Sequence, residues 1–282
     1  FHFVPYELQW QPTHKDRDMK VYGELFTSTA FLEAHQELQD SPPTLGCSLP
    51  RVVAVLMFWS DSTQLTQFGS AKLWPLYVFF GNKSKYRRCQ PSNHSCSHTA
   101  YFQVLPDEFK DFLTEQFGGK YPGEVLLTHC NREFFHEQWK KLLDDDFIEA
   151  YKHGMAIMCC DGIKRRFYPQ IFTYSANYPE KVLIASIRNL GVCPCPRCTI
   201  PMMEVPNMGT RQDMLQRQQL SCVDDFARQK RDNYAVNTPQ VEALLRDESL
   251  VPVSNAFSDR LCALGFNFFL MLVVDLLHEF EL

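Results

Sequence analysis

Several features that would quickly assign a function or a location are missing from this 282-residue sequence. Its start lacks the basic, apolar and small-residue succession of a secretory signal. The longest apolar run, residues 265–277, contains Asn267 and Asp275 and is too short to cross a bilayer. We therefore expect this run to form a buried core helix, and we expect no membrane partner.

The fingerprints of three common enzyme classes are missing as well. The sequence contains no P-loop, no glycine-rich dinucleotide motif and no serine-nucleophile triad motif. It also contains no internal repeat and no low-complexity tract. Function must therefore be inferred from isolated polar residues and cysteines.

An excess of positive charge is also missing, because the net charge is −5. The chain as a whole is therefore not attracted to nucleic acid or to an anionic membrane. An anionic ligand would have to meet local basic clusters, such as residues 83–88 and 164–166. Carboxylates that hold divalent cations also lower the net charge, so its sign does not exclude a nuclease-like site.

The composition is that of a folded chain, with 45% hydrophobic and 22% charged residues. This suffices for one large domain or two small ones. The 11 cysteines are odd in number and irregularly spaced, which favours a reducing, intracellular compartment with a few metal-ligating thiols. The chain begins at Phe1 and stops within a regular segment, so we expect a fragment of a longer protein.

Three apolar runs with short polar connections predict an antiparallel meander of strands over residues 51–59, 73–80 and 100–105. Two further strands are expected over residues 155–160 and 167–174. Helices are expected over residues 25–38, 107–117, 131–152, 179–189, 211–234, 238–246 and 254–282.

This order predicts an α/β fold and is compatible with an RNase H-like core, a mixed sheet with flanking helices, over residues 49–192. An N-terminal helical and extended segment, residues 1–48, precedes this core. A zinc-knuckle and helical insertion, residues 193–282, follows it.

Carboxylates follow two of the predicted strands. Asp61 comes directly after the most apolar strand, where it could bind Mg²⁺ in a two-metal phosphodiester site. The alternative is a turn or helix-capping role before Ser62 and Thr63. Asp161 ends the strand at residues 155–160, but Asp-Gly is also an ordinary turn.

The strongest local signal is Cys195-x₂-Cys198, with Cys193 two residues earlier. Turns of this type suit tetrahedral Zn²⁺ because their backbone amides stabilise thiolates. One such pair is half a zinc site, so further ligands must come from elsewhere. The candidates are His278, Cys222 and Cys262. Free thiols and a redox pair are the alternatives.

Near the end of the chain, Asp275, His278 and Glu279 follow the i, i+3, i+4 spacing of one helical face. That face could bind a metal ion. It could equally be the polar side of a half-buried helix.

Three blocks of sequence resemble a known family. They are LMFWSDSTQLTQFGSAKLWPLYVFFGNKSKYRR, YPQIFTYSANYPEKVLIASIRNLGVCPCPRC and FNFFLMLVVDLLHEFEL. All three resemble Plavaka-type transposases of the KDZ (Kyakuja-Dileera-Zisupton) group, which is related to the CACTA transposases. The resemblance runs from about Val21 to Leu282.

The resemblance implies a DDE/D-type transposase with an RNase H-like core that cuts and rejoins DNA with two Mg²⁺ ions. It implies DNA partners (transposon ends and target), a nuclear location and a structural Zn²⁺, and it leaves a homo-oligomer open. The first catalytic acid falls on Asp61 and the second on Asn177. Cys195 and Cys198 begin the zinc-binding insertion. Asp275, His278 and Glu279 would supply a zinc ligand, the third acid, or both.

Asn177 stands where the family motif has an aspartate. A neutral amide adds no negative charge between two cations that lie about 4 Å apart, so we expect a catalytically degenerate enzyme. Asp161 is a substitute ligand under one hypothesis. A non-catalytic DNA-binding or assembly module is the alternative function. If the mapping holds, Asp61 and Asn177 should meet at the ends of adjacent strands.

Overall fold

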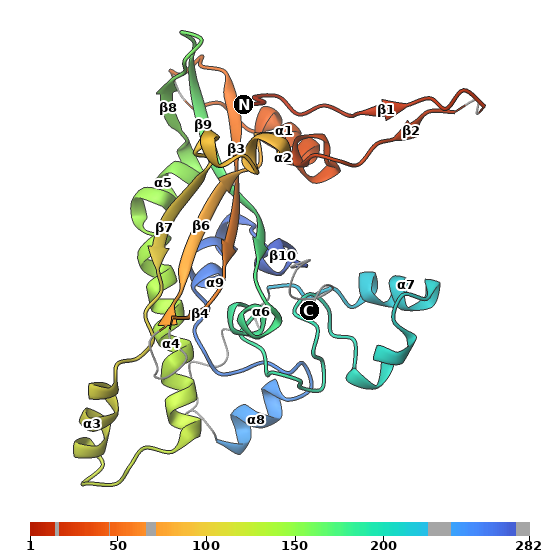
Figure 1. Ribbon diagram of the computed structural model, residues 1–282. Helices are drawn as coiled ribbons and strands as arrows, with labels where there is room; N and C mark the ends of the chain where they lie inside the picture. Colours follow the sequence, from red (N-terminus) through yellow and green to blue (C-terminus); the bar gives the residue numbers. More distant parts are fainter. Residues whose placement is uncertain (15–16, 45, 66–71, 225–237, 275–282) are drawn as a thin grey trace. The chain divides into compact units, whose positions relative to one another are not determined.

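The computed structural model describes residues 1–14, 17–44, 46–65, 72–224 and 238–274 (Figure 1). The chain folds as two compact units. The first consists of Phe1–Trp59, Leu76–Ala100 and Asp145–Thr173, and the second of Ser60–Pro75, Tyr101–Asp144 and Tyr174–Leu282. No helix within the described ranges has the length and hydropathy needed to cross a membrane.

Six strands form one mixed sheet in the order β10-β9-β3-β6-β7, and β8 pairs with β9 outside this order. The strands are β3 (Arg51–Ser60), β6 (Pro75–Phe80), β7 (Cys96–Tyr101), β8 (Met155–Met158), β9 (Lys164–Ser175) and β10 (Leu272–Val273). β10 is parallel to β9, whereas β8 is antiparallel to it. The strands β3, β6 and β7 are neighbours in chain order, as the predicted meander requires.

Two contacts show that β3 and β9 run in the same direction. Near their starts, the Arg166 amide donates to the Pro50 carbonyl at 2.9 Å. At their ends, the Ser60 and Tyr174 hydroxyls are 2.7 Å apart. The carboxyl ends of β3 and β9 therefore lie at the same edge of the sheet.

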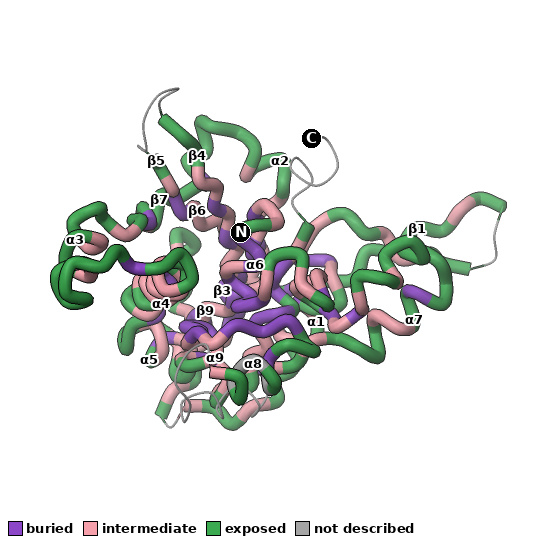
Figure 2. Tube along the Cα trace, turned by 90° about the horizontal axis from the view of Figure 1, so that it is seen from below, coloured by how far each residue is buried: buried purple, intermediate pink, exposed green. Residues whose placement is uncertain are grey.

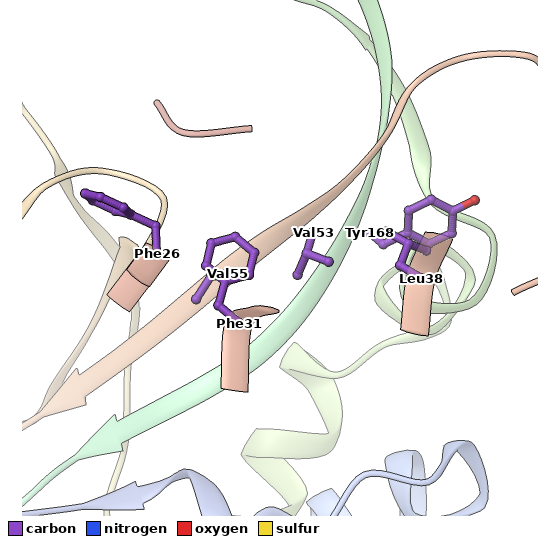
Figure 3. Close-up of a cluster of buried hydrophobic side chains, with 6 residues drawn as sticks. All are labelled: Phe26, Phe31, Leu38, Val53, Val55 and Tyr168. Carbon is purple, nitrogen blue, oxygen red and sulfur yellow. The ribbon is translucent and has the colours of Figure 1, made fainter. Parts of the chain in front are cut away.

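The apolar run in β3 packs on both of its faces within the first unit. On one face, Val53 and Val55 contact Phe26, Phe31, Leu38 and Tyr168 (Figure 3). Phe31 and Leu38 lie on α1 (Thr29–Asp40), which begins after Ser28 accepts a hydrogen bond from the Phe31 amide. On the other face, Val52 and Ala54 pack with Phe167. This burial on both sides explains why β3 lacks a polar alternation (Figure 2).

A buried asparagine closes the turn that follows β6 in the first unit. Asn82 accepts from the Val55 amide and donates to the carbonyls of Val53 and His2, with distances of 2.9 to 3.0 Å. A Cβ on the preceding Gly81 would lie only 2.4 Å from Leu25 Cδ2. The turn is therefore closely fixed to β3, and α2 (Lys85–Arg88) follows it directly.

The core of the second unit forms where α4 (Glu124–Leu142) packs with α9 (Ala256–Leu261). Trp139 is fully buried, with its ring 4.7 Å from that of Phe257 and 5.5 Å from that of Tyr174. The buried His136 ring lies 3.1 Å from the Ser186 hydroxyl and 3.3 Å from the Ala256 amide. Aromatic packing and one polar network thus join the helices.

The other helices have these bounds: α3 (Asp107–Gln116), α5 (Asp145–His153), α6 (Tyr178–Ile184), α7 (Arg211–Gln219) and α8 (Pro239–Leu245). Short strands are β1 (Gln9–Trp10), β2 (Met19–Lys20), β4 (Thr63–Gln64) and β5 (Lys72–Leu73). The single helix predicted over residues 131–152 is two helices, α4 and α5. The predicted helix over residues 211–234 ends at Gln219, and residues 225–234 lie outside the described ranges.

The prediction of one buried helix over residues 265–277 is wrong for its described part. Gly265 has φ 81°, a left-handed conformation that ends a preceding 3₁₀ turn. Asn267 then caps a new 3₁₀ turn, Phe268–Met271, by accepting from the Phe269 amide. Leu272 and Val273 extend to pair with β9 as β10. Apolar runs of this length do not distinguish a buried helix from a buried strand.

Candidate functional site

The structure brings Asp61 and Asn177 together. Asp61 directly follows β3, and Asn177 lies two residues beyond the end of β9. The Asn177 side-chain nitrogen Nδ2 donates to Asp61 Oδ1 across a long 3.5 Å contact. Both side chains are half-buried. The expected meeting of these residues at the ends of adjacent strands is confirmed.

Asn177 has a structural role of its own as the N-cap of α6. Its backbone is extended, with φ −62° and ψ 162°, and its Oδ1 accepts from the Glu180 amide at 3.0 Å. Asparagine and aspartate are about equally good at this position. The amide of Asn177 therefore uses its oxygen to begin the helix and its nitrogen to meet Asp61.

The sequence interpretation missed Glu180, a carboxyl group that is 4% exposed beneath this edge. Its Oε2 accepts from the Trp74 indole at 3.0 Å, and its Oε1 lies 3.2 Å from the Tyr174 hydroxyl. The Ser60 hydroxyl makes a very short contact with the same Oε1. Burial raises the pKa of Glu180 from 4.5 to about 7, and the charge of Asp61 adds to this while the hydrogen bonds oppose it.

Tyr174 completes the buried cluster of Ser60, Trp74, Tyr174 and Glu180. Burial raises the pKa of Tyr174 well above its usual value, and the nearby Glu180 carboxyl adds to the increase. Ser60 belongs to β3, Tyr174 to β9 and Glu180 to α6. The cluster thus connects the residue before Asp61 to the helix that Asn177 caps. Nothing in a Pro-Glu-Lys sequence reveals that its glutamate will point inward.

Asp161 lies in the first unit, in the tight turn between β8 and β9. Its two carboxylate oxygens receive hydrogen bonds from Arg165, at 2.8 and 2.7 Å, and the Ile163 amide donates to Oδ1 at 3.1 Å. The hydrogen bond from Arg165 is the main reason that the pKa of Asp161 falls to about 2. The geometry is that of an ion-paired hairpin turn.

Cys195 and Cys198 lie together in the second unit. A hydrogen bond from Cys198 lowers the pKa of Cys195 to about 6, and the pKa of Cys198 is raised by the same contact. The Arg197 amide donates to the Cys195 sulfur, and the Arg217 guanidinium donates to the Cys198 sulfur, each at 3.4 Å. This pair of thiols is thus surrounded by donors that stabilise negative charge.

The other cysteines of this region have separate contacts. The Cys193 thiol is buried and lies 3.3 Å from the carbonyl oxygens of Thr199 and Asp247. Cys222 is close to the Cys195–Cys198 turn in the backbone, because its amide donates to the Arg197 carbonyl at 2.9 Å. The Cys262 thiol lies 3.7 Å from the Asp224 carbonyl oxygen.

A family model described as Plavaka transposase matches residues 1–281. The chain belongs to the Plavaka transposase family. No curated protein and no solved structure matches it. The Plavaka match includes both structural units, so the Asp61–Asn177 pair and the Cys195–Cys198 turn both lie within the family's region.

Three predicted site residues of this Plavaka chain, Asp275, His278 and Glu279, lie outside the described residues. Among the residues that are described, no three His, Cys, Asp or Glu side chains are grouped so that they could hold a metal ion. β10 ends at Val273 beside Ser175 of β9. The Lys181 ammonium lies 3.4 Å from the Val273 carbonyl, close to the point where the described chain ends.

Chemically, the described site of the Plavaka chain offers one half-buried carboxylate on Asp61 and one amide on Asn177. The buried Glu180 carboxyl is oriented towards Trp74, Ser60 and Tyr174. The carboxylate of Asp61 can accept hydrogen bonds or bind a cation, whereas Glu180 fixes the position of the two strand ends.

Proposed function

We propose that this chain is a transposon-derived DNA transposase of the DDE/D type whose catalytic centre has degenerated. Membership of the Plavaka family makes transposon DNA its expected partner. The observation that supports the assignment of the site is the meeting of Asp61 and Asn177 after two parallel, adjacent strands. A relationship to the KDZ and CACTA groups, and a nuclear location, belong to the same proposal.

The strand order supports an RNase H-like core within this proposal. Three sequential strands, β3, β6 and β7, are neighbours, and β9 joins the other side of β3 in the same direction. β10 then adds in parallel to β9. In this arrangement the carboxyl ends of β3 and β9 lie at the same edge of the sheet. Asp61 follows β3 and Asn177 follows β9 at that edge.

In the ancestral enzyme, Asp61, the residue at position 177 and an acid from residues 275–279 would hold two Mg²⁺ ions. Such ions activate a nucleophilic oxygen and stabilise the leaving oxygen of a phosphodiester. The described residues of this chain fit that role incompletely. Asp61 is a suitable ligand, but Asn177 is neutral and its Oδ1 already accepts from the Glu180 amide. We therefore assign no catalytic step to this chain.

The same contacts favour a second candidate, a DNA-binding or assembly module without catalysis. Two aspartates at positions 61 and 177 would repel each other unless a cation lay between them. With asparagine at 177, an amide hydrogen points towards Asp61 and the strand ends close without a cation. The substitution is thus compatible with a stable fold that has lost its metal chemistry.

A nicking and strand-transfer assay with Mg²⁺ distinguishes the two candidates. The native chain, Asp61→Ala, Asn177→Asp and the double variant Asp61→Ala/Asn177→Asp are compared on DNA that carries transposon ends. We expect no product from the native chain, product from Asn177→Asp and none from the double variant. Product from the native chain that disappears in Asp61→Ala would contradict the proposed degeneration. If none of the four proteins forms product, the non-catalytic candidate is favoured.

We further propose a structural Zn²⁺ at Cys195 and Cys198. The lowered pKa of Cys195 supports one thiolate ligand, and the Arg217 guanidinium that donates to the Cys198 sulfur would stabilise a second one when a metal ion replaces the hydrogen bond between the thiols. Cys222, which is near in the backbone, and His278 are the candidates for the remaining positions. Metal analysis should find one zinc per purified chain, and Cys195→Ser should abolish it. Zinc content that is unchanged in Cys195→Ser would refute this site.

A further inference from the structure

The distribution of charge along the chain is uneven in a way that the proposed site does not explain. The protein has 33 Asp and Glu residues, yet none of them lies between Ser62 and Pro106. That stretch contains Lys72, Lys83, Lys85, Arg87 and Arg88. A protein of net charge −5 thus has a long segment with Lys and Arg residues but no Asp or Glu.

Four residues of this segment form a patch in the first unit, which we call the α2 surface: Lys83, Lys85, Tyr86 and Arg87. Lys83 is half-buried, and its ammonium donates to the Ser95 hydroxyl at 3.3 Å. Lys85, Tyr86 and Arg87 are exposed, and the Tyr86 side chain is 73% exposed. The Lys85 ammonium lies 5.5 Å from the centre of the Tyr86 ring. Within the described ranges, no carboxylate is at ion-pair distance from the Lys85 or Arg87 side chain.

The backbone beneath the α2 surface is fixed from several sides. Asn82 joins the turn to β3 through its three hydrogen bonds. Ser84 caps α2 by accepting from the Arg87 amide, and the Arg88 guanidinium makes a very short contact with the Lys83 carbonyl. The Glu24 carboxylate accepts from the Lys85 amide at 2.9 Å. Because this backbone is already fixed, binding a ligand would have to order only the exposed side chains and not the loop itself.

The second basic cluster of the sequence, residues 164–166, is used differently. Arg165 pairs with Asp161 and lies 3.9 Å from the centre of the Phe3 ring. The Arg166 guanidinium donates to the carbonyls of His153 and Gly154. These arginines hold the hairpin together, whereas Lys85 and Arg87 of the α2 surface are exposed.

We propose that the α2 surface binds the sugar–phosphate backbone of DNA. Lysine and arginine neutralise phosphates without regard to sequence, and an exposed tyrosine can stack on an unpaired base. The strand β7, which follows α2 along the chain, exposes Ser97 and Thr99, which are hydroxyl donors suited to phosphate oxygens. This inference rests on the proposed function, since it names where the transposase would hold DNA outside the Asp61–Asn177 site.

The test measures DNA binding by fluorescence anisotropy, with a duplex and a single strand of the same sequence, between 50 and 300 mM salt. The variant Lys85→Gln/Arg87→Gln removes two charges from the α2 surface. The control Lys110→Gln/Lys141→Gln removes two charges from α3 and α4. Tyr86→Ala is measured with the single strand.

We expect Lys85→Gln/Arg87→Gln to weaken duplex binding about 30-fold at 0.15 M salt, because each lost phosphate contact reduces the salt exponent by about 0.9. The control should change the affinity less than threefold. Tyr86→Ala should weaken binding of the single strand more than that of the duplex.

Equal losses in Lys85→Gln/Arg87→Gln and in the control would overturn the assignment to this surface while leaving the proposed function intact. Native binding that is tenfold tighter to RNA of the same sequence would overturn DNA as the ligand. A native chain that binds no DNA at any salt concentration would count against the proposed function itself. A circular dichroism spectrum that matches the native one keeps each variant interpretable.

Discussion

The buried carboxyl group of Glu180 should make the stability of this protein depend on pH between about 4.5 and 7. Its pKa is raised in the folded chain from 4.5 to about 7, chiefly by burial. The folded state therefore binds a proton more tightly than the unfolded state in this window. Because the folded pKa of an acid is raised, its contribution to stability is present at low pH and is lost as the pH rises through 7.

The variant Glu180→Gln isolates this effect. Glutamine has the same shape, so its carbonyl can accept from Trp74 while its amide donates to the Ser60 and Tyr174 hydroxyl oxygens. It remains neutral at every pH. At about 1.4 kcal/mol per pKa unit, the raised pKa corresponds to about 3 kcal/mol of unfolding free energy. Between pH 4.5 and 8, the native chain should lose about this much relative to Glu180→Gln.

Urea unfolding followed by tryptophan fluorescence at half-unit pH steps measures the difference. The exposed residue Glu115 on α3 supplies the control, because Glu115→Gln should run parallel to the native chain over the whole range. If the difference between the native chain and Glu180→Gln stays constant from pH 4.5 to 8, the buried carboxyl does not titrate in this window. Burial then does not raise the pKa of Glu180.

Three further predictions follow from other contacts. Asn177→Ala should lower the unfolding free energy by about 1 kcal/mol through loss of the α6 cap. Asn177→Asp keeps the cap and should stay within about 0.5 kcal/mol when Mg²⁺ is present to separate its carboxylate from that of Asp61. Equal losses of the two variants in urea unfolding with Mg²⁺ would argue against the capping role. Asn82→Ala leaves the Val55 amide and the Val53 carbonyl unsatisfied and should lower the unfolding free energy by about 3 kcal/mol, measured by urea unfolding. A loss below about 1 kcal/mol would show that water replaces the hydrogen bonds of the asparagine. Arg217→Gln removes the donor that holds the pKa of the buried Asp213 low, so it should lower Tm at pH 7. The difference in Tm between the native chain and the variant should shrink as the pH falls below the ordinary carboxyl range. A Tm difference that is independent of pH would count against this ion pair.

The strongest parts of the fold were visible in the sequence. The run that became β3 is apolar on both faces and could be recognised as a central strand. The end of the meander was harder to place, because β7 is an exposed strand of Ser, His and Thr residues. The prediction began this strand at residue 100, whereas it begins at Cys96. The more apolar residues that follow it leave the sheet, as Phe102 packs against Trp74 and Phe135.

The candidate site was partly predictable for a physical reason. The carboxyl ends of parallel neighbours lie at one edge, so Asp61 and Asn177 could be expected to meet once both strands were recognised. The role of Glu180 could not be predicted, because its inward direction depends on Trp74 and Tyr174 from other parts of the chain. The helix expected over residues 265–277 failed for a similar reason, since the pairing of β10 with β9 is a tertiary contact.

The cap at the start of α6 has a consequence for how this gene can change over time. Asparagine and aspartate serve about equally well as the cap, so the start of α6 tolerates either residue. Their codons differ by a single base, so the exchange can occur in either direction while the cap is kept. Under the proposed function, a lineage of such copies can lose the second acid, keep the start of α6 and later regain the acid by one mutation. The residue type at this cap can therefore change the chemistry of the site while the helix that it begins is kept.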